Sequence, residues 1–305
     1  MRPTHQDENP TIERYRSIIP DWERFMAASA RPLPYVVRVN TLRISPELLI
    51  DRLRSRGIEG EPIPWEPALI RLDRPPGRLI EHWLGLFYAQ EAVQALPVLV
   101  LDPRPNETIL DLCAAPGGKA THIAARMENT GCLVANEPSG RRQQGLLANI
   151  NRLGVVNATI TDYRGESFPT SARFDRVLVD APCSAEGTLR KARSLQGGAR
   201  KGAIHRLSRL QKRLVLRAYD LLRPGGILVY STCTFAPEEN EAVIAHLLSE
   251  RDGRIAPISL PFSASPGLTE WLGERFGEDM AGCARIYPHE IDSGGGFIAR
   301  IERPR

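Results

Sequence analysis

Residues 108–125 read TILDLCAAPGGKATHIAA, and this stretch decides the fold that the sequence predicts. It begins as a short, mostly apolar strand over 108–113, in which Asp111 is the only charged residue. The Pro-Gly-Gly at 116–118 is typical of a tight turn where the backbone can approach a ligand closely. Lys119 then begins a helix whose free N–H groups face the same place. A strand, a tight turn and a helix in this order predict one unit of an α/β sheet with a ligand site at the turn.

The same alternation of strand and helix continues towards the C-terminus. Further strands are expected at 132–137, 158–162, 176–182 and 227–233, with helices that include 141–153 and 207–222. Short, nearly continuous apolar strands that alternate with helices are typical of a parallel sheet covered on both faces. Residues 284–302 indicate instead two strands joined by a Gly-rich turn, an antiparallel pair at the sheet edge. We therefore predict one α/β domain over 86–305, with a doubly wound, mostly parallel sheet of seven strands.

Residues 1–85 follow a different pattern, which predicts a small N-terminal α/β subdomain. Its expected elements are a helix over 11–28, strands over 35–42 and 68–72, and a helix over 45–57. The second helix has Ser45 as its cap, Pro46 in its first turn and Gly57 at its end. The subdomain is rich in arginine, namely Arg31, Arg38, Arg43, Arg52, Arg54 and Arg56. These arginines indicate either a binding surface or a solvated basic face without a specific role.

The composition of the chain limits its class. A length of 305 residues with 42% hydrophobic content allows one large core, or one large and one small core. The five cysteines are odd in number and form no C-x-x-C pair, so we expect reduced thiols, no disulfide framework and no metal site. Reduced thiols, with no signal-peptide core and no apolar stretch of membrane length, predict a soluble, cytoplasmic protein without a membrane partner. The net charge of +4 weakly favours a polyanionic partner, and we expect a monomer.

Acidic residues close three successive strands, at the edge where open parallel sheets bind ligands. They are Asp111, Glu137 and Asp162. A single acid at such a position is most often a helix cap, but three in succession indicate a ligand site. Glu137 stands where a carboxylate can accept both hydroxyls of a ribose. Asp162 would lie within reach of an adenine amino group.

The glycine-rich turn matches neither of two common nucleotide-binding patterns. A P-loop requires a glycine five positions before Gly118 and Ser or Thr after its lysine, whereas this sequence has Cys113 and Ala120 there. The G-x-G-x-x-G dinucleotide fingerprint is absent. An adenosyl ligand without phosphates remains, because it needs backbone room and acids for its amine and ribose rather than a phosphate cradle.

Two cysteines lie at the ends of the fourth and fifth strands. Asp180 precedes Pro182 and Cys183, and a proline there directs the chain out of the sheet and exposes the thiol. Cys233 ends the next strand, which should lie beside the fourth. A single cysteine is more often an inert core residue than a nucleophile, but two at strand ends beside one ligand pocket favour a reactive pair. The other thiols are expected to pack or give no indication, namely Cys113, Cys132 and Cys283.

Three segments together resemble the signature segments of a known family. They are DLCAAPGGKATH (111–122), DAPCSAEG (180–187) and STCTFAPEENE (231–241). They closely resemble the Sun (Fmu/RsmB-type) family of S-adenosylmethionine-dependent RNA cytosine-5 methyltransferases, and the similarity extends over residues 34–302. One departure is Ala185, where the family often carries glycine. The resemblance implies a class I methyltransferase, Rossmann-like fold for the larger domain, S-adenosylmethionine as the cofactor, rRNA or tRNA as the substrate, and an RNA-binding role for the N-terminal subdomain.

The resemblance also implies which residues hold the cofactor and which carry the reaction. The cofactor site would comprise Cys113, Ala114, Ala115, Pro116, Gly117, Gly118, Lys119, Glu137, Arg142, Asp162, Asp180 and Pro182. Cys233 would be the nucleophile that attacks C6 of cytosine and thereby allows C5 to accept a methyl group, and Cys183 would assist breakdown of the adduct. Asp180 would hydrogen-bond the N3 and N4 edge of the base. Lys119 either keeps a thiol ionised or positions Asp180, and the sequence leaves both open.

A long basic run follows the fourth strand. No acidic residue occurs between Glu186 and Asp220. The same span contains Arg190, Lys191, Arg193, Arg200, Lys201, Arg206, Arg209, Lys212, Arg213 and Arg217. A run of one sign beside the expected site is typical of a surface that binds a phosphate backbone, whereas a merely solvated helix face mixes both signs. The glycine pair at 197–198 indicates that part of this span is a mobile loop ordered by RNA.

We therefore expect an RNA (cytosine-5) methyltransferase that acts through a covalent Cys–C6 adduct. The alternative is a non-catalytic RNA-binding or ribosome-assembly factor on the same fold, which loss of a thiol or of the cofactor acids would favour. Methylation of DNA or of a small molecule is disfavoured, because DNA enzymes of this chemistry usually carry the Pro-Cys thiol as the nucleophile.

Overall fold

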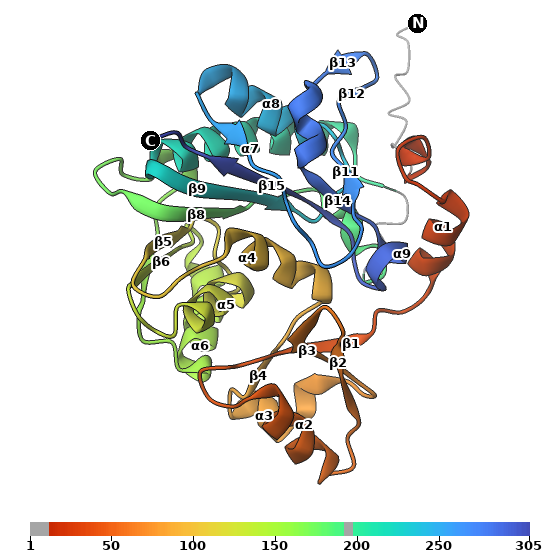
Figure 1. The fold of residues 1–305 in the computed structure, drawn as a ribbon, viewed down its shortest axis with the longest axis vertical. Coiled ribbons are helices and arrows are strands. Elements are labelled where there is room, and N and C mark those ends of the chain that lie inside the picture. The colour runs from red at the N-terminus through yellow and green to blue at the C-terminus, as the bar shows by residue number, and fades with distance from the viewer. Residues whose placement is uncertain (1–11, 192–197) are drawn as a thin grey trace, which may run out of the picture.

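A mixed sheet of nine strands forms the centre of the protein (Figure 1), for which a computed structural model describes residues 12–191 and 198–305. The strand order is β11-β14-β15-β9-β8-β5-β6-β7, and β10 pairs with β15. The five parallel strands are β5 (Thr108–Asp111), β6 (Cys132–Asn136), β7 (Ala158–Thr161), β8 (Phe174–Asp180) and β9 (Leu222–Thr232). The antiparallel strands are β10 (Arg254–Ile255), β11 (Ser265–Pro266), β14 (Ala284–Ile286) and β15 (Gly296–Glu302). The prediction of a doubly wound, mostly parallel sheet is confirmed, and the two-residue strands β10 and β11 add to the seven predicted strands.

Helices cover both faces of this sheet, as the sequence predicts. Figure 1 shows α4, α5 and α6 on one face and α7 and α8 on the other. Their bounds are α4 Leu96–Leu101, α5 Gly118–Arg126, α6 Gly140–Leu153, α7 Lys201–Asp220 and α8 Glu241–Glu250. Successive side chains of β8 alternate between the two apolar cores, since Val177 and Val179 pack with α7 and α8 while Leu178 packs with α4 and α5. In residues 12–191 and 198–305, none of the helices is both long and apolar enough to cross a lipid bilayer.

A second, antiparallel sheet lies near the N-terminus, with the strand order β2-β3-β1-β4. Its elements are β1 (Tyr35–Val39), α2 (Pro46–Arg54), β2 (Gly60–Ile63), β3 (Glu66–Leu72), α3 (Ile80–Trp83) and β4 (Phe87–Ala89). The predicted cap is confirmed, because Ser45 Oγ accepts a hydrogen bond from Leu48 N at 3.3 Å. Val37 to Val39 of β1 pair with β4, so this sheet continues past residue 85, where the sequence analysis places the boundary. We call these elements the N-terminal unit.

The first described residues do not belong to the N-terminal unit. A single helix over 11–28 is wrong, because the chain forms a 3-10 turn (η1, Ile12–Tyr15) and a separate helix α1 (Trp22–Ala30). Pro20 lies between them and cannot continue a helix from the preceding turn. Both elements pack on the larger domain, where Phe25 stacks edge-on against Phe235 with ring centroids 5.6 Å apart. Figure 1 shows α1 beside α9 (Pro288–Ile291), far along the chain.

The arginines of the N-terminal unit do not form one solvated face. Arg38 is buried. Arg52 and Arg56 both bind the buried carboxylate of Glu81, at 3.0 and 2.8 Å. Arg38 therefore serves the fold, whereas Arg52 and Arg56 keep side chains that are 44% exposed, so a binding role for these two stays a prediction. The remaining short elements are η2 (Pro76–Arg78), η3 (Ala92–Ala95), η4 (Gly165–Ser167), η5 (Glu186–Thr188), β12 (Glu270–Trp271), β13 (Glu274–Arg275) and η7 (Glu278–Gly282).

A buried ion pair fixes the segment that follows Cys233. Glu241, at the start of α8, accepts hydrogen bonds from Arg285 of β14 at 2.6 and 2.5 Å, and both side chains are almost fully buried. Arg285 also donates to the carbonyl oxygen of Phe235 at 3.1 Å. Removing one partner leaves a buried charge without compensation, which is far costlier than losing an exposed pair.

We expect Glu241→Ala to lower the free energy of unfolding by about 3–5 kcal/mol, measured by urea denaturation. The matched control is Asp51→Ala, which breaks the exposed Asp51–Arg54 pair and should cost less than about 1 kcal/mol. The double variant Glu241→Leu/Arg285→Met should lose less unfolding free energy than Glu241→Ala, because no buried charge remains unpaired. Equal losses for Glu241→Ala and Asp51→Ala would contradict the structural role of this pair.

Candidate active site

The two cysteines at the strand ends meet at one edge of the central sheet. Strands β8 and β9 run parallel, with Asp180 opposite Ser231, so the loops that follow them leave the sheet side by side. Cys183 Sγ lies 3.3 Å from Cys233 Sγ and 3.4 Å from the backbone nitrogen of Cys233. The loops are also tied by their backbones, since Gly187 N donates to the carbonyl oxygen of Cys233 at 2.8 Å.

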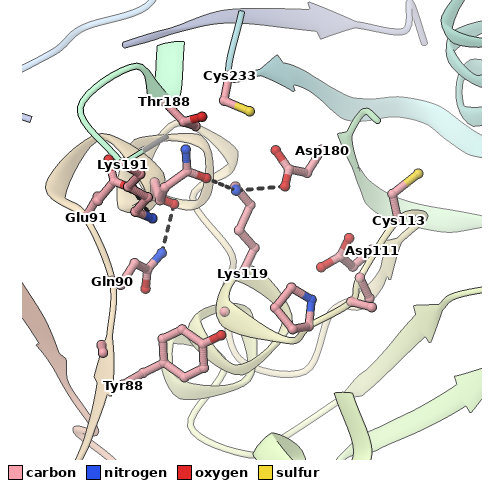
Figure 2. A pocket seen from close by; sticks show the side chains of 16 residues that line it. Tyr88, Gln90, Glu91, Asp111, Cys113, Lys119, Asp180, Thr188, Lys191 and Cys233 are labelled. Atoms are coloured by element: carbon pink, nitrogen blue, oxygen red, sulfur yellow. Dashed lines mark hydrogen bonds and ion pairs between the residues drawn. The ribbon is translucent and has the colours of Figure 1, made fainter. Parts of the chain in front are cut away.

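A lysine from the neighbouring strand–helix unit reaches the same edge. Lys119 Nζ lies 2.8 Å from Asp180 Oδ2 and 2.5 Å from Gln94 Oε1, and Figure 2 shows it pointing towards Asp180. The other oxygen of Asp180 accepts a hydrogen bond from Ser231 Oγ at 3.0 Å. The carboxylate is therefore held from both sides, by a cation from α5 and a hydroxyl from β9.

The two thiols differ in their electrostatic surroundings. A hydrogen bond from Cys183 lowers the pKa of Cys233, and the nearby Lys119 ammonium lowers it further against burial and the charge of Asp180. The same hydrogen bond raises the pKa of Cys183, as do burial and the carboxylate of Glu239. Because the hydrogen bond between the thiols lowers the pKa of Cys233 and raises that of Cys183, Cys233 is the thiol that ionises first. The sequence left two roles open for Lys119, and this geometry supports both.

The first of two hollows at this edge, which we call the Glu137 hollow, measures about 230 Å³. Its apolar walls are Leu112, Pro138, Leu210 and Leu214. Glu137 is buried there, accepts a hydrogen bond from Ser139 N at 2.9 Å and pairs with Arg142 at 3.0 Å. Arg142 also donates to the carbonyl oxygen of Ala115 at 2.9 Å. An apolar hollow with a buried acid on its wall suits an adenine ring and its ribose.

The second hollow, which we call the Lys119 hollow, measures about 300 Å³ (Figure 2). One wall carries Asp111 and Cys113, and Figure 2 shows Glu91 and Lys191 on the wall across from them. The two hollows share four lining residues, namely Cys113, Ala115, Asp180 and Cys233. Cys233 and the neighbouring Asp180 therefore stand where the two hollows meet.

The residues present fit an adenosyl ligand that carries an amine. Asp111 is fully buried, and in the described part of the chain neither of its carboxylate oxygens meets a hydrogen-bond partner. Burial and the neighbouring Asp180 raise its pKa to about 7. A buried carboxylate without a donor is costly, and the amine of a bound ligand would satisfy it. Glu137 would serve the ribose in the same way.

The structure brings most of the predicted cofactor residues to these hollows. The Lys119 hollow includes Ala114, Pro116, Gly118 and Lys119, the Glu137 hollow includes Glu137, Arg142 and Pro182, and both include Cys113, Ala115 and Asp180. Gly117 lines neither and instead forms the turn, with a φ of +106° that favours glycine. Asp162 follows β7, is exposed and lines neither hollow, so its contact with adenine stays a prediction. Cys132, expected to pack, is exposed at the start of β6.

A group of polar residues on the wall of the Lys119 hollow was not predicted from the sequence. They are Tyr88, Gln90, Glu91 and Gln94. Gln90 accepts from the buried Arg38 at 2.8 Å and donates to the carbonyl oxygen of Gln94 at 2.9 Å. The available signal was a group of polar residues, Gln90, Glu91 and Gln94, within a mostly apolar segment.

The basic run is only partly available to a ligand. Arg190 has a buried side chain that donates to the carbonyl oxygens of Arg31 and Pro32 at 3.0 and 2.6 Å, so it ties the loop to the chain before β1. The exposed members among the described residues are Lys191, Arg200, Lys201, Arg206, Arg209 and Arg213. Arg193 and Gly197 lie outside the described residues, so the expected mobile loop is described only in part.

We expect Cys183→Ala to raise the pKa of Cys233, because the hydrogen bond that most lowers this pKa is lost. The alkylation rate of the Cys233 peptide, followed by mass spectrometry with iodoacetamide, should shift to higher pH. Cys132→Ala, which removes an exposed thiol outside both hollows, should leave the pH profile of Cys233 alkylation unchanged. An unchanged profile in Cys183→Ala would contradict the assignment of Cys233 as the ionised member of the pair.

Comparison with known proteins places the whole chain in one family. Residues 98–302 match the family described as 16S rRNA methyltransferase RsmB/F, and residues 11–77 match its ferredoxin-like domain. The chain is 42% identical over 299 residues to the tRNA (cytosine(49)-C(5))-methyltransferase of Pyrococcus abyssi, with 96% of each chain covered. It is 38% identical to ribosomal RNA small subunit methyltransferase F of Vibrio parahaemolyticus, covering 99% of this chain but 64% of that protein.

Solved structures agree with this placement. A methyltransferase homologue from Pyrococcus horikoshii superposes with a TM-score of 0.81 at 36% identity, covering 92% of this chain and 90% of the other. NSun6 from Pyrococcus horikoshii, solved with SFG, an analogue of S-adenosylmethionine, gives a TM-score of 0.83 at 25% identity over 98% of both chains. The predicted class I methyltransferase fold is thereby confirmed. The chain belongs to the RsmB/F family of methyltransferases.

Proposed function

We propose that the protein is an S-adenosylmethionine-dependent RNA (cytosine-5) methyltransferase that acts on rRNA or tRNA through a covalent Cys233 adduct. The names of its relatives support the activity. The observation that carries the mechanism is the 3.3 Å contact between Cys183 and Cys233 where the two hollows meet. The alternative, a non-catalytic RNA-binding factor, requires neither a lowered thiol pKa nor acids converging on the same edge.

The donor would occupy the Glu137 hollow and extend towards Asp111. S-adenosylmethionine supplies an electrophilic methyl group when it is bound. Glu137 would hold its ribose, and the unpartnered carboxylate of Asp111 would accept from its amine. The target cytosine would enter the Lys119 hollow, and it must be unpaired or flipped out of a helix to do so.

The first chemical task is to make C5 of cytosine nucleophilic. The Cys233 thiolate adds to C6, which breaks the aromaticity of the ring and makes C5 enamine-like. Asp180 would hydrogen-bond the N3 and N4 edge of the base and share a proton with it, while Lys119 offsets the negative charge that develops there. Ser231 and Lys119 hold Asp180 in place for this contact.

The second task is to release the methylated base. The proton on C5 passes to water, the C5–C6 double bond forms again, and the bond between C6 and sulfur breaks. Cys233 leaves as a thiolate. Cys183 has a raised pKa and therefore keeps its proton, so it can donate a hydrogen bond to the departing sulfur at the distance observed. Without that donor the adduct should persist.

We expect Cys183→Ala to trap protein on RNA, because the adduct forms but breaks down slowly. The variant, incubated with S-adenosylmethionine and unmodified rRNA or tRNA transcripts, should give a protein–RNA band that survives a denaturing gel. Cys233→Ala should give no such band and should lose methyl transfer by roughly 10³-fold or more, since nothing replaces the nucleophile. Incorporation of the labelled methyl group into 5-methylcytosine measures the second result.

Cys132→Ala serves as the control, since it removes an exposed thiol away from the site. It should methylate at the rate of the unaltered protein and leave no adduct. A covalent band in Cys233→Ala would reverse the roles assigned to the two cysteines. The absence of a band in Cys183→Ala, together with normal turnover, would remove the releasing role of Cys183.

A further inference from the structure

A third hollow continues from the Lys119 hollow onto the N-terminal unit, and we call it the Tyr35 groove. It measures about 300 Å³, the same volume as the Lys119 hollow. Its far wall comprises Leu33, Pro34, Tyr35, Val36 and Pro76. Its near wall is shared with the Lys119 hollow and comprises Ala89, Gln90, Glu91 and Lys191. The two hollows therefore adjoin along these four residues.

Glu91 stands on the shared wall with an unsatisfied oxygen. Its side chain is 8% exposed, and Oε1 contacts Lys191 Nζ. Oε2 is buried and meets no hydrogen-bond donor in residues 12–191 and 198–305. Buried carboxylate oxygens are nearly always hydrogen-bonded, so this position indicates a donor supplied by a ligand. Glu91 has no part in the proposed reaction of the two cysteines.

Tyr35 offers a flat aromatic face at the outer end of the groove. It is the exposed first residue of β1, whose four following residues are buried, and 44% of its surface is accessible. Aromatic side chains beside a cationic groove are typical platforms for the bases of single-stranded nucleic acid. Lys191 is 57% exposed on the shared wall, where a cation can contact the phosphate that joins two nucleotides.

We propose that the Tyr35 groove binds the nucleotide adjacent to the target cytosine and selects an amino-bearing purine over uridine at that position. The neighbouring base would stack on Tyr35 and donate from its amino group to Glu91 Oε2. Uridine is disfavoured, because its two carbonyl oxygens flank its only N–H and would face the carboxylate. This inference rests on the proposed function, since it extends the binding site for the same RNA.

The test uses a nine-nucleotide RNA with one cytosine and the fluorescent base 2-aminopurine on its 5′ or its 3′ side. S-adenosylhomocysteine is present, so that binding is measured without turnover. The unaltered protein should quench the fluorescence on one of the two sides. Tyr35→Ala should lose this quenching and bind about 5- to 150-fold more weakly, which corresponds to one base–aromatic stack. Tyr35→Phe should retain both the quenching and the binding affinity, because the aromatic ring remains.

Trp83→Ala is the matched control, since Trp83 is a 68% exposed aromatic residue of the same unit that lines none of the three hollows. This variant should quench the 2-aminopurine fluorescence to the same extent as the unaltered protein. Full quenching by Tyr35→Ala, or no quenching by the unaltered protein on either side, would overturn the inference.

Methylation of longer transcripts separates this inference from the proposed function. Transcripts that differ only in the neighbouring base should be methylated faster with adenosine or guanosine than with uridine, and Glu91→Gln should reduce this preference because an amide can donate to a carbonyl. Methylation that ignores the neighbouring base in the unaltered protein would overturn the inference and leave the function standing. A failure to methylate any RNA cytosine, with quenching intact, would overturn the function instead.

Discussion

The parallel pairing of β8 and β9 is the constraint on which the site depends. With Asp180 opposite Ser231, both chains must leave the sheet at the same edge. A hydroxyl on one strand therefore orients the carboxylate on the other, and the thiols that follow come into contact. Neither cysteine is unusual in isolation. Their difference in pKa arises first from the hydrogen bond between them, which lowers the pKa of Cys233 and raises that of Cys183, and second from the charges of Lys119 and Glu239.

The N-terminal unit contributes to this edge as well as covering it. Arg38 of β1 is buried and donates to Gln90 at 2.8 Å, to the carbonyl oxygen of Gly118 at 3.2 Å and to Thr121 at 2.9 Å. The guanidinium thus joins the wall of the Lys119 hollow to the turn that begins α5. Burial lowers its pKa to about 9. In consequence, the unit with the Tyr35 groove and the turn proposed to hold the cofactor form one connected surface.

Local patterns in the sequence predicted the strands, the glycine turn and the acids at the strand ends, because each depends on a few adjacent residues. Associations between distant segments were not predictable in this way. The packing of α1 against α9 depends on Phe25 meeting Phe235, and β4 joins the N-terminal sheet through a register with β1 that no spacing reveals. Likewise, Glu91 and Gln94 became site residues only when the topology placed them across from Asp111. The exposed Asp162 shows the converse, since a strand-end acid need not line a hollow.

The most direct test is a crystal structure of the protein with S-adenosylmethionine and a short RNA whose target base is 5-fluorocytosine. Fluorine at C5 cannot leave as a proton does, so the methylated adduct should accumulate. We expect continuous density between Cys233 Sγ and C6 of the base, with the product S-adenosylhomocysteine in the Glu137 hollow and Cys183 beside the new bond. Density joining the base to Cys183 would contradict the assignment of Cys233 as the nucleophile. A product bound away from the Glu137 hollow would contradict the proposed cofactor site.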